Sequence, residues 1–256
     1  MPQPHQARTD PVLAPPLPAL DTIALFADLD GTLAPLEVNP SDVGPDLARR
    51  SILCDLNTAL DGRLAIISGR TLADLDRILD GQVAAVAAIH GLVRRTAAGV
   101  VWRTDGEGRL GGAVDAMHAF ASRRPGLLVE NKGLAVALHY RLAPEAREPS
   151  REIARELAGR HGLQVQDGDM VVELRVPGAD KGSALSAFMA EPPFSGFTPW
   201  FIGDDLTDEN GFSAARALGG HGIIVGTRRP TLASFALCGP GAVTAWLRRA
   251  IGSGRV

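Results

Sequence analysis

Two pairs of carboxylates stand directly after short apolar runs in this sequence. Asp28 and Asp30 follow the run 23–27, and Asp204 and Asp205 follow 200–202. The period of two in a strand directs Asp28 and Asp30 to the same side, so one carboxylate can attack while the other moves protons. The next residues, 31–33, leave backbone N–H groups that can face an anion. A capping or solvated turn is the open alternative for this pattern taken alone.

The second acidic segment, residues 203–209 (GDDLTDE), favours a metal site. Neighbouring carboxylates repel one another, so a cation usually offsets the cost of gathering them, and hard oxygen ligands favour Mg²⁺ over zinc or copper. The alternative is an acidic helix N-terminus, because Thr207, Asp208 and Glu209 are also good capping residues. That alternative applies more to Asp208 and Glu209 than to the Asp204–Asp205 pair.

Ser68 and Lys181 add a hydroxyl and an ammonium group. Ser68 ends the apolar run 64–67, and Lys181 precedes a predicted helix. Together with the two acid pairs they supply what phosphoryl transfer needs: a nucleophile, an acid/base, a metal site and two groups that hold the phosphate. Lys181 is one of two lysines beside 24 arginines, which favours a site that needs a compact point charge.

The elements that must position these groups alternate between strands and helices. Short apolar runs at 23–27, 64–67, 200–202 and 223–225 predict strands buried on both faces. Helical spacing of apolar residues follows at 45–60 and from a capping Thr71 onward. Alternating strands and helices predict an α/β fold with a doubly wound parallel sheet, whose functional groups lie outside the carboxyl ends of its strands.

The middle of the chain has a different pattern. A helix at 110–122, a strand pair in 126–142, a helix at 144–161 and a second pair in 164–176 predict an antiparallel α+β insert. We therefore predict a core domain from residues 21–105 and 178–256 and an inserted α+β cap domain at 106–177. Residues 1–20, with six prolines, are predicted to form a flexible tail.

Composition excludes several classes of function. The chain has 256 residues, a formal net charge of −3 and 21% charged residues, with no long basic block, so nucleic acid is not the expected partner. Its longest apolar runs are far shorter than the ~18 residues that span a bilayer. Cys54 and Cys238 form no CxxC pattern, which disfavours a disulfide framework or zinc site. We expect a cytoplasmic protein that binds a small molecule, with a monomer favoured.

Four ordered motifs resemble those of the haloacid dehalogenase superfamily of phosphatases: residues 28–33 (DLDGTL), 68–70 (SGR), 181–182 (KG) and 203–205 (GDD). The insert lies between the serine and lysine motifs, as in the type 2 capped members that act on sugar phosphates. The resemblance implies a Rossmann-like core, an enzyme and a Mg²⁺ cofactor.

The resemblance also implies a role for each motif residue. Asp28 would be the nucleophile that forms an aspartyl-phosphate intermediate, and Asp30 would be the general acid and base. Ser68 and Lys181 would hold the phosphoryl oxygens. The implied metal ligands are the Asp28 carboxylate, the Asp30 backbone carbonyl and Asp204, with Asp205 assisting.

Finer phrases, such as 88–91 (AIHG), 130–133 (ENKG), 138–141 (LHYR) and 172–175 (VELR), resemble the trehalose-6-phosphate phosphatase family. The implied reaction is hydrolysis of trehalose 6-phosphate to trehalose and phosphate. Carboxylates and amides bind sugar hydroxyls well, and the resemblance places substrate contacts in these phrases. The expected substrate-binding residues are Arg70, His90, Glu130, Asn131, Lys132, His139, Arg141 and Glu173.

Alternatives remain for these residues and for the function. Glu130 and Glu173 could instead pair with Arg141 or Arg175, His139 could pack across strands, and Arg70 could bind nearby carboxylates. Another capped phosphatase, acting on sucrose, mannosylglycerate or hexose phosphates, would share the core motifs. A phosphoacceptor signalling module would share the clustered acids and the lysine, but Asp30 and the insert argue against it, since an acid/base there serves a leaving group and a hydrolytic water.

Overall fold

The computed structural model describes residues 13–106 and 108–253. Residues 1–12 of the predicted flexible tail lie outside the described residues. The rest of that segment contacts the chain's C-terminal part: the Ala236 N–H donates to the Leu13 carbonyl at 2.9 Å, and the Trp246 indole donates to the Pro16 carbonyl at 3.1 Å. A proline-rich segment makes few backbone bonds of its own, so its carbonyls are available to such donors.

The chain folds into two compact units. The first, the core unit, consists of the segments up to Trp102 and from Asp180 onward, and the second, the inserted unit, is Arg103–Ala179. The limits predicted for the cap domain, 106 and 177, lie just inside the inserted unit. That the two units are separate domains stays a prediction.

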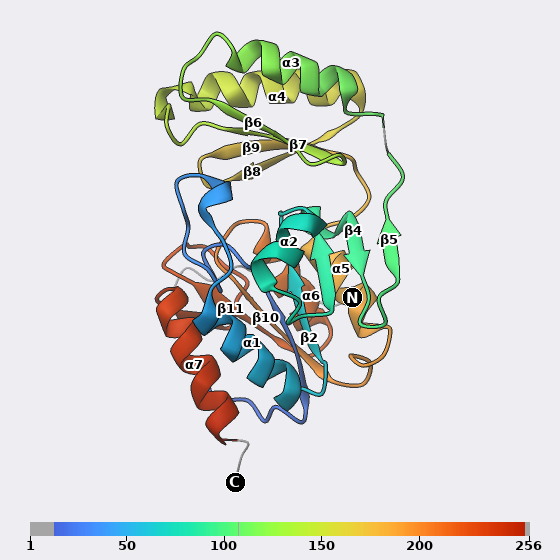
Figure 1. Ribbon diagram of the computed structural model, residues 1–256, viewed down its shortest axis with the longest axis vertical. Coiled ribbons are helices and arrows are strands. Elements are labelled where there is room, and N and C mark those ends of the chain that lie inside the picture. Colours follow the sequence, from blue (N-terminus) through green and yellow to red (C-terminus); the bar gives the residue numbers. More distant parts are fainter. Residues whose placement is uncertain (1–12, 107, 254–256) are drawn as a thin grey trace. The chain divides into compact units, whose positions relative to one another are not determined.

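The core unit contains an eight-stranded mixed sheet (Figure 1). The strands are, in spatial order, β12 (Phe235–Leu237), β11 (His221–Val225), β10 (Thr198–Gly203), β1 (Ile23–Ala27), β2 (Leu64–Ile67), β3 (Ala85–Ala88), β4 (Val93–Arg95) and β5 (Val101–Arg103). The six strands from β12 to β3 pair in parallel, which confirms the predicted α/β class, whereas β4 is antiparallel to β3.

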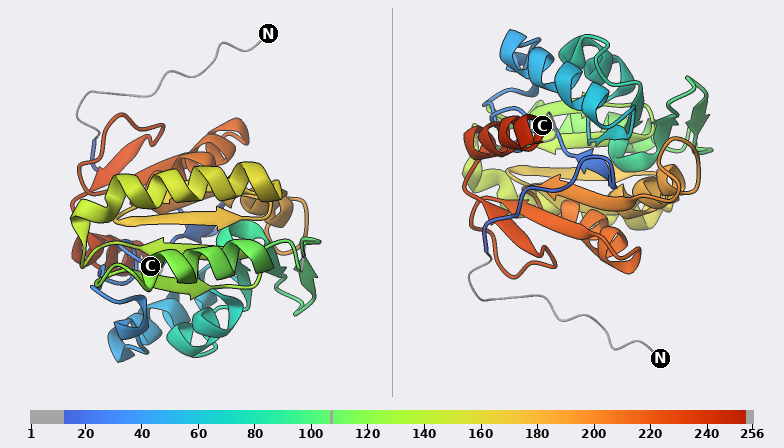
Figure 2. Two further views of the ribbon diagram at one scale, coloured as in Figure 1. Left: turned by 90° about the horizontal axis from the view of Figure 1, so that it is seen from above. Right: turned by 90° about the horizontal axis from the view of Figure 1, so that it is seen from below.

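Helices cover both faces of this sheet (Figures 1 and 2). The pair α1 (Leu47–Ala59) and α7 (Pro240–Ser253) packs on one face, and the pair α5 (Lys181–Met189) and α6 (Asp208–Ala217) packs on the other. Strand β1 is buried at every residue, and its Phe26 joins Phe188 of α5 and Phe194 in a buried aromatic cluster. Burying apolar side chains on both faces holds the central strands in place.

Shorter elements follow the carboxyl ends of β1, β2 and β3 along the chain. Helix α2 (Leu72–Leu79) begins at the predicted cap Thr71, whose hydroxyl accepts the Asp74 N–H at 3.1 Å. Single 3-10 turns are found at Pro40–Asp42 and Ile89–Gly91. The second turn contains consecutive left-handed residues, Ile89 (φ 49°) and His90 (φ 56°).

The inserted unit is a four-stranded antiparallel sheet with two helices. The order is β6 (Leu128–Asn131), β7 (Ala135–His139), β9 (Val171–Arg175) and β8 (Gln164–Gly168), which confirms the predicted strand pairs. Helices α3 (Gly111–Ala121) and α4 (Arg147–His161), the latter preceded by a 3-10 turn at Pro144–Ala146, lie side by side across one face (Figure 2, left). The other face carries Glu130 and Glu173, which lie in one row across Ala137.

Candidate active site

Neighbouring parallel strands bring the predicted chemical groups of the core unit together. Strand β1 lies between β10 and β2, with Ala27 level with Ile202 and Ile66. Asp28, Ser68 and Asp204 each follow the last residue of one of these strands. The carboxyl ends of parallel strands therefore bring three of the four motifs to a single edge of the sheet.

Lys181, the fourth motif, lies in the interior at this edge. The half-buried Asp180 caps α5 and so sets the position of Lys181, the first helical residue. The Lys181 ammonium is 1% exposed and lies 2.8 Å from Asp28 Oδ2 and 2.6 Å from Asp208 Oδ1. Burial alone would lower the pKa of Lys181, but the charges of Asp208 and Asp28 outweigh it and raise that pKa. Lys181 is therefore a fixed cation beside the candidate nucleophile.

Asp208 is a functional residue that sequence reasoning did not assign to the site. Its Oδ1 accepts from Lys181, and its Oδ2 accepts the N–H groups of Asp204 and Asp205, both at 2.9 Å. Asp208 is fully buried. The signal that could have found it is Lys181 itself, because an ammonium group that is buried must be paired with an acid.

The carboxylates here fit a divalent cation. One oxygen each from Asp28, Asp204 and Asp208 lie within 4.8 Å of one another. Burial raises the pKa of Asp28 to about 6 even though Lys181 opposes the shift. Burial, with the charges of Asp28 and Asp208, raises the pKa of Asp204 to about 8. Hard oxygens whose burial and mutual repulsion raise their pKa values form the kind of donor set that a divalent metal ion stabilises.

Gly31 leaves room for the Asp204 carboxylate. Gly31 has φ +72°, and a Cβ at this position would overlap the Asp204 side chain. The Thr32 hydroxyl donates to Asp204 Oδ1 at 3.3 Å. The turn after β1 thus holds the carboxylate of the residue that follows β10.

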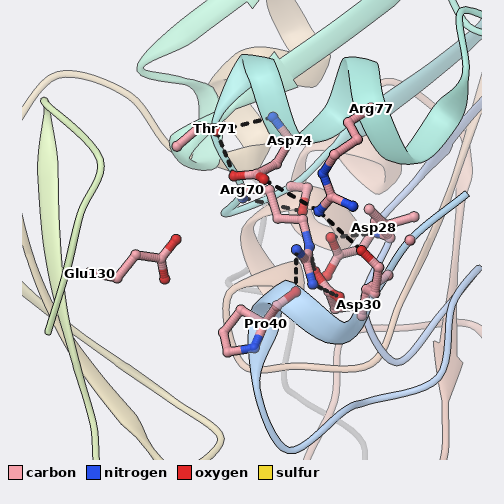
Figure 3. A network of polar contacts seen from close by, with 12 residues as sticks. Asp28, Asp30, Pro40, Arg70, Thr71, Asp74, Arg77 and Glu130 are labelled. Atoms are coloured by element: carbon pink, nitrogen blue, oxygen red, sulfur yellow. Dashed lines mark hydrogen bonds and ion pairs between the residues drawn. The ribbon is translucent and has the colours of Figure 1, made fainter. Parts of the chain in front are cut away.

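Arg70 binds the candidate acid/base (Figure 3). Its Nε donates to Asp30 Oδ2 and its Nη2 to Asp30 Oδ1, each at 2.7 Å, while Nη1 donates to the Pro40 carbonyl at 2.8 Å. Arg70 is 8% exposed. Arg70 thus binds a nearby carboxylate, as its chemistry also allowed, and a substrate contact of Arg70 stays a prediction.

His90 supports the turn that carries Ser68. The backbone N–H of His90 donates to the Ser68 carbonyl, and that of Ile89 donates to the Arg70 carbonyl, both at 2.9 Å. The buried imidazole packs so closely on Gly69 that a Cβ there would lie 2.5 Å from Nε2. A substrate contact of His90 stays a prediction.

Four of the predicted sugar contacts form a polar cluster on the inserted unit. Lys132 Nζ lies 3.4 Å from Glu173 Oε1 and 3.9 Å from Glu130 Oε2, and His139 Nε2 lies 3.0 Å from Glu130 Oε2. Burial would raise the pKa of Glu130, but the hydrogen bond with His139 and the charge of Lys132 outweigh it and lower that pKa. The two glutamates thus share a lysine partner.

Asn131 and Arg141 have other contacts. Asn131 Oδ1 accepts the Gly133 N–H at 2.9 Å and so closes the turn between β6 and β7. Arg141 pairs with Asp169 at 2.7 Å, at an exposed position. The carboxylate of Asp205 accepts the Leu206 N–H at 2.7 Å, and its predicted part in metal binding stays a prediction.

Comparisons with known proteins agree with this arrangement. The profile of the trehalose-phosphatase family matches residues 26–239. A trehalose-6-phosphate phosphatase of Escherichia coli (strain K12) is 40% identical over 229 residues, which is 88% of this chain and 85% of the relative. Among the described residues, no helix is long and apolar enough to cross a membrane.

Solved structures give the same relationship. The crystal structure of a trehalose-6-phosphate phosphatase related protein superposes with a TM-score of 0.76 at 30% identity, and the match covers 90% of this chain and 97% of that one. A phosphatase of the haloalkanoate (HAD) enzyme superfamily from Bacteroides thetaiotaomicron, 16% identical with a TM-score of 0.62 over 93% of this chain and 97% of its own, shares the fold.

Proposed function

Because the chain belongs to the trehalose-phosphatase family and is therefore a phosphoric monoester hydrolase, we propose that it hydrolyses trehalose 6-phosphate to trehalose and phosphate. One observation supports the chemistry most: the buried Lys181 ammonium lies 2.8 Å from the Asp28 carboxylate, beside Asp204. A cation next to a nucleophilic carboxylate offsets the charge of an incoming phosphate, which would otherwise be repelled.

In the proposed first step, an oxygen of Asp28 attacks phosphorus and the bond between phosphorus and the sugar oxygen breaks. Asp30 gives its proton to the departing oxygen, and the phosphoryl group stays on Asp28 as an acyl phosphate. Ser68 and Lys181 hold the phosphoryl oxygens. In the second step, Asp30 removes a proton from a water that attacks phosphorus, which releases phosphate and restores Asp28.

For the cofactor we propose Mg²⁺, held by the carboxylates of Asp28 and Asp204 and the backbone carbonyl of Asp30, with Asp205 assisting. When bound, the ion neutralises charge on the phosphoryl oxygens. Asp208 would support this site as a positioning residue, because its carboxylate accepts from Lys181 and from the N–H groups of Asp204 and Asp205.

For the sugar we propose the face of the inserted sheet that carries Glu130, Lys132, His139 and Glu173. Their acceptors and donors alternate within a few ångströms, and alternation of this kind suits hydroxyl groups, which both donate and accept. Asn131 and Arg141 are proposed as flanking contacts. A cytoplasmic location and a monomeric state stay predictions.

Phosphate release from a panel of substrates tests this proposal. The panel contains trehalose, sucrose, mannosylglycerate and glucose phosphates, each with and without Mg²⁺, with Asp28→Asn as the control. We expect Mg²⁺-dependent preference for trehalose 6-phosphate that is lost in the control. Preference for another sugar phosphate would contradict the substrate and keep the mechanism, and no release from any of them would contradict both.

A further inference from the structure

The guanidinium of Arg228 contacts the backbone of the loop that carries the candidate metal ligand Asp204. Arg228 lies in the segment after β11, and its Nη2 donates to the Asp205 carbonyl at 3.0 Å and its Nε to the Asp204 carbonyl at 3.4 Å. The side chain also lines an open pocket of ≈ 370 Å³ together with Gly31 and Asp204. No sequence motif singled this arginine out.

Glu209 fixes Arg228 in this position. Glu209 lies in the first turn of α6, and its Oε1 accepts from Arg228 Nη2 at 2.6 Å. Its Oε2 accepts the Leu232 N–H at 2.7 Å, which ties down the far end of the same segment. The carboxylate therefore does more than favour a helix N-terminus, because it holds a specific arginine.

The Asp204–Asp205 loop is thus held from two sides. Its N–H groups donate to Asp208, and its carbonyls accept from Arg228. A peptide restrained at both its donors and its acceptors has little freedom to tilt, so the Cα–Cβ bond of Asp204, from which its carboxylate extends, keeps one direction. A lysine at position 228 would lack the planar fork that reaches both carbonyls.

We propose that Arg228 and Glu209 are positioning residues that hold Asp204 in the geometry needed to bind a divalent cation. The inference rests on the proposed function only in taking Asp204 as a metal ligand. Groups that orient a ligand commonly change metal affinity by about tenfold to a hundredfold when they are replaced.

The test is calorimetric titration of the substrate-free protein with MgCl₂, together with thermal unfolding of each metal-free variant. Arg228→Gln and Glu209→Gln should each weaken Mg²⁺ binding by about tenfold or more, and Arg228→Lys should recover only part of the loss. Arg216→Gln is the matched control, because Arg216 donates to the Leu232 carbonyl of the same segment at 3.2 Å. It should bind Mg²⁺ like the wild type.

The outcomes separate the inference from a structural role and from the proposed function. Wild-type affinity in folded Arg228→Gln or Glu209→Gln, or an equal loss in Arg216→Gln, would overturn the inference. If either Arg228→Gln or Glu209→Gln does not fold, the Mg²⁺ affinities of the other variant and of Arg228→Lys test the inference. A wild type that binds Mg²⁺ but releases no phosphate from trehalose 6-phosphate would contradict the proposed function alone.

Discussion

Arg70 donates to both carboxylate oxygens of Asp30, each at 2.7 Å, across 40 positions of sequence. A planar guanidinium that binds a carboxylate through two parallel hydrogen bonds fixes its orientation as well as its position. The same guanidinium reaches the Pro40 carbonyl, so the candidate acid/base is tied to the 3-10 turn at Pro40–Asp42.

Replacing Arg70 with alanine should lower turnover of trehalose 6-phosphate by about tenfold to a hundredfold, because general acid/base catalysis contributes ~10²–10⁴-fold and depends on orientation. An aryl phosphate has a leaving group that needs no proton, so its turnover should fall much less. Steady-state rates on both substrates measure this. Equal losses on the two would mean that Arg70 contacts the phosphate instead of orienting Asp30.

Replacing Gly31 with alanine should impair metal binding specifically. The added methyl group would overlap the Asp204 carboxylate, so Mg²⁺ affinity should fall by about tenfold or more. Gly81→Ala is the control, because Gly81 has nearly the same φ (+71°) but open space around it. Both variants should lose about 1–2 kcal/mol of unfolding free energy from the left-handed backbone. Normal Mg²⁺ affinity in folded Gly31→Ala would contradict the placement of Asp204.

The stability gained from Mg²⁺ should increase with pH. The pKa values of Asp28 and Asp204, about 6 and about 8, lie above the ordinary value of 3.8. Between pH 3.8 and about 8 the folded protein therefore holds more protons on these groups than the unfolded chain does. The free energy of unfolding of the metal-free protein therefore loses a contribution from these groups as pH rises through this window. A bound cation offsets the repulsion between the ionised carboxylates.

Thermal unfolding with Mg²⁺ and with a chelator measures this difference. The shift in Tm caused by Mg²⁺ should be larger at about pH 8.5 than at about pH 5.5. Asp204→Asn should flatten the dependence. A shift that shrinks as pH rises would show that these carboxylates do not carry the effect.

Replacing Glu130 or Glu173 with alanine should separate sugar binding from phosphoryl transfer. Each variant loses a partner of Lys132, so turnover of the sugar phosphate should fall by about tenfold or more while that of a small aryl phosphate changes little. Asp167→Asn is a control on the same sheet, since Asp167 pairs with Arg151 at 2.8 Å. Equal losses on both substrates would remove the sugar assignment.

Much of the core unit was predictable because its candidate catalytic and metal-binding residues belong to short motifs, most of them directly after strands. The apolar runs that precede Asp28, Ser68 and Asp204 predict buried parallel strands, and parallel strands share one carboxyl edge. The antiparallel strand β4 gave no such signal, because only one of its three residues, Val93, is buried. The alanine-rich β3 lacks the larger side chains typical of strands.

The contacts between side chains were less predictable. Asp208 and Glu209 lie in the first turn of a helix, where an acid can serve simply to stabilise the helix N-terminus. Only their partners in the structure reveal a role in the site: Lys181 for Asp208 and Arg228 for Glu209. Arg70 could bind substrate or carboxylate by its chemistry alone. Long-range pairing is decided by the fold, and a single sequence does not state which of many arginines reaches which acid.

The most direct test of the central claim is chemical trapping of the acyl phosphate on Asp28. Wild-type protein is mixed with trehalose 6-phosphate and Mg²⁺, quenched during turnover and reduced with borohydride, which converts an aspartyl phosphate to homoserine. Mass spectrometry of the peptide that contains position 28 should find homoserine there only when substrate and Mg²⁺ are present. Full turnover with Asp28 unmodified, or with homoserine at position 30 instead of position 28, would contradict Asp28 as the nucleophile.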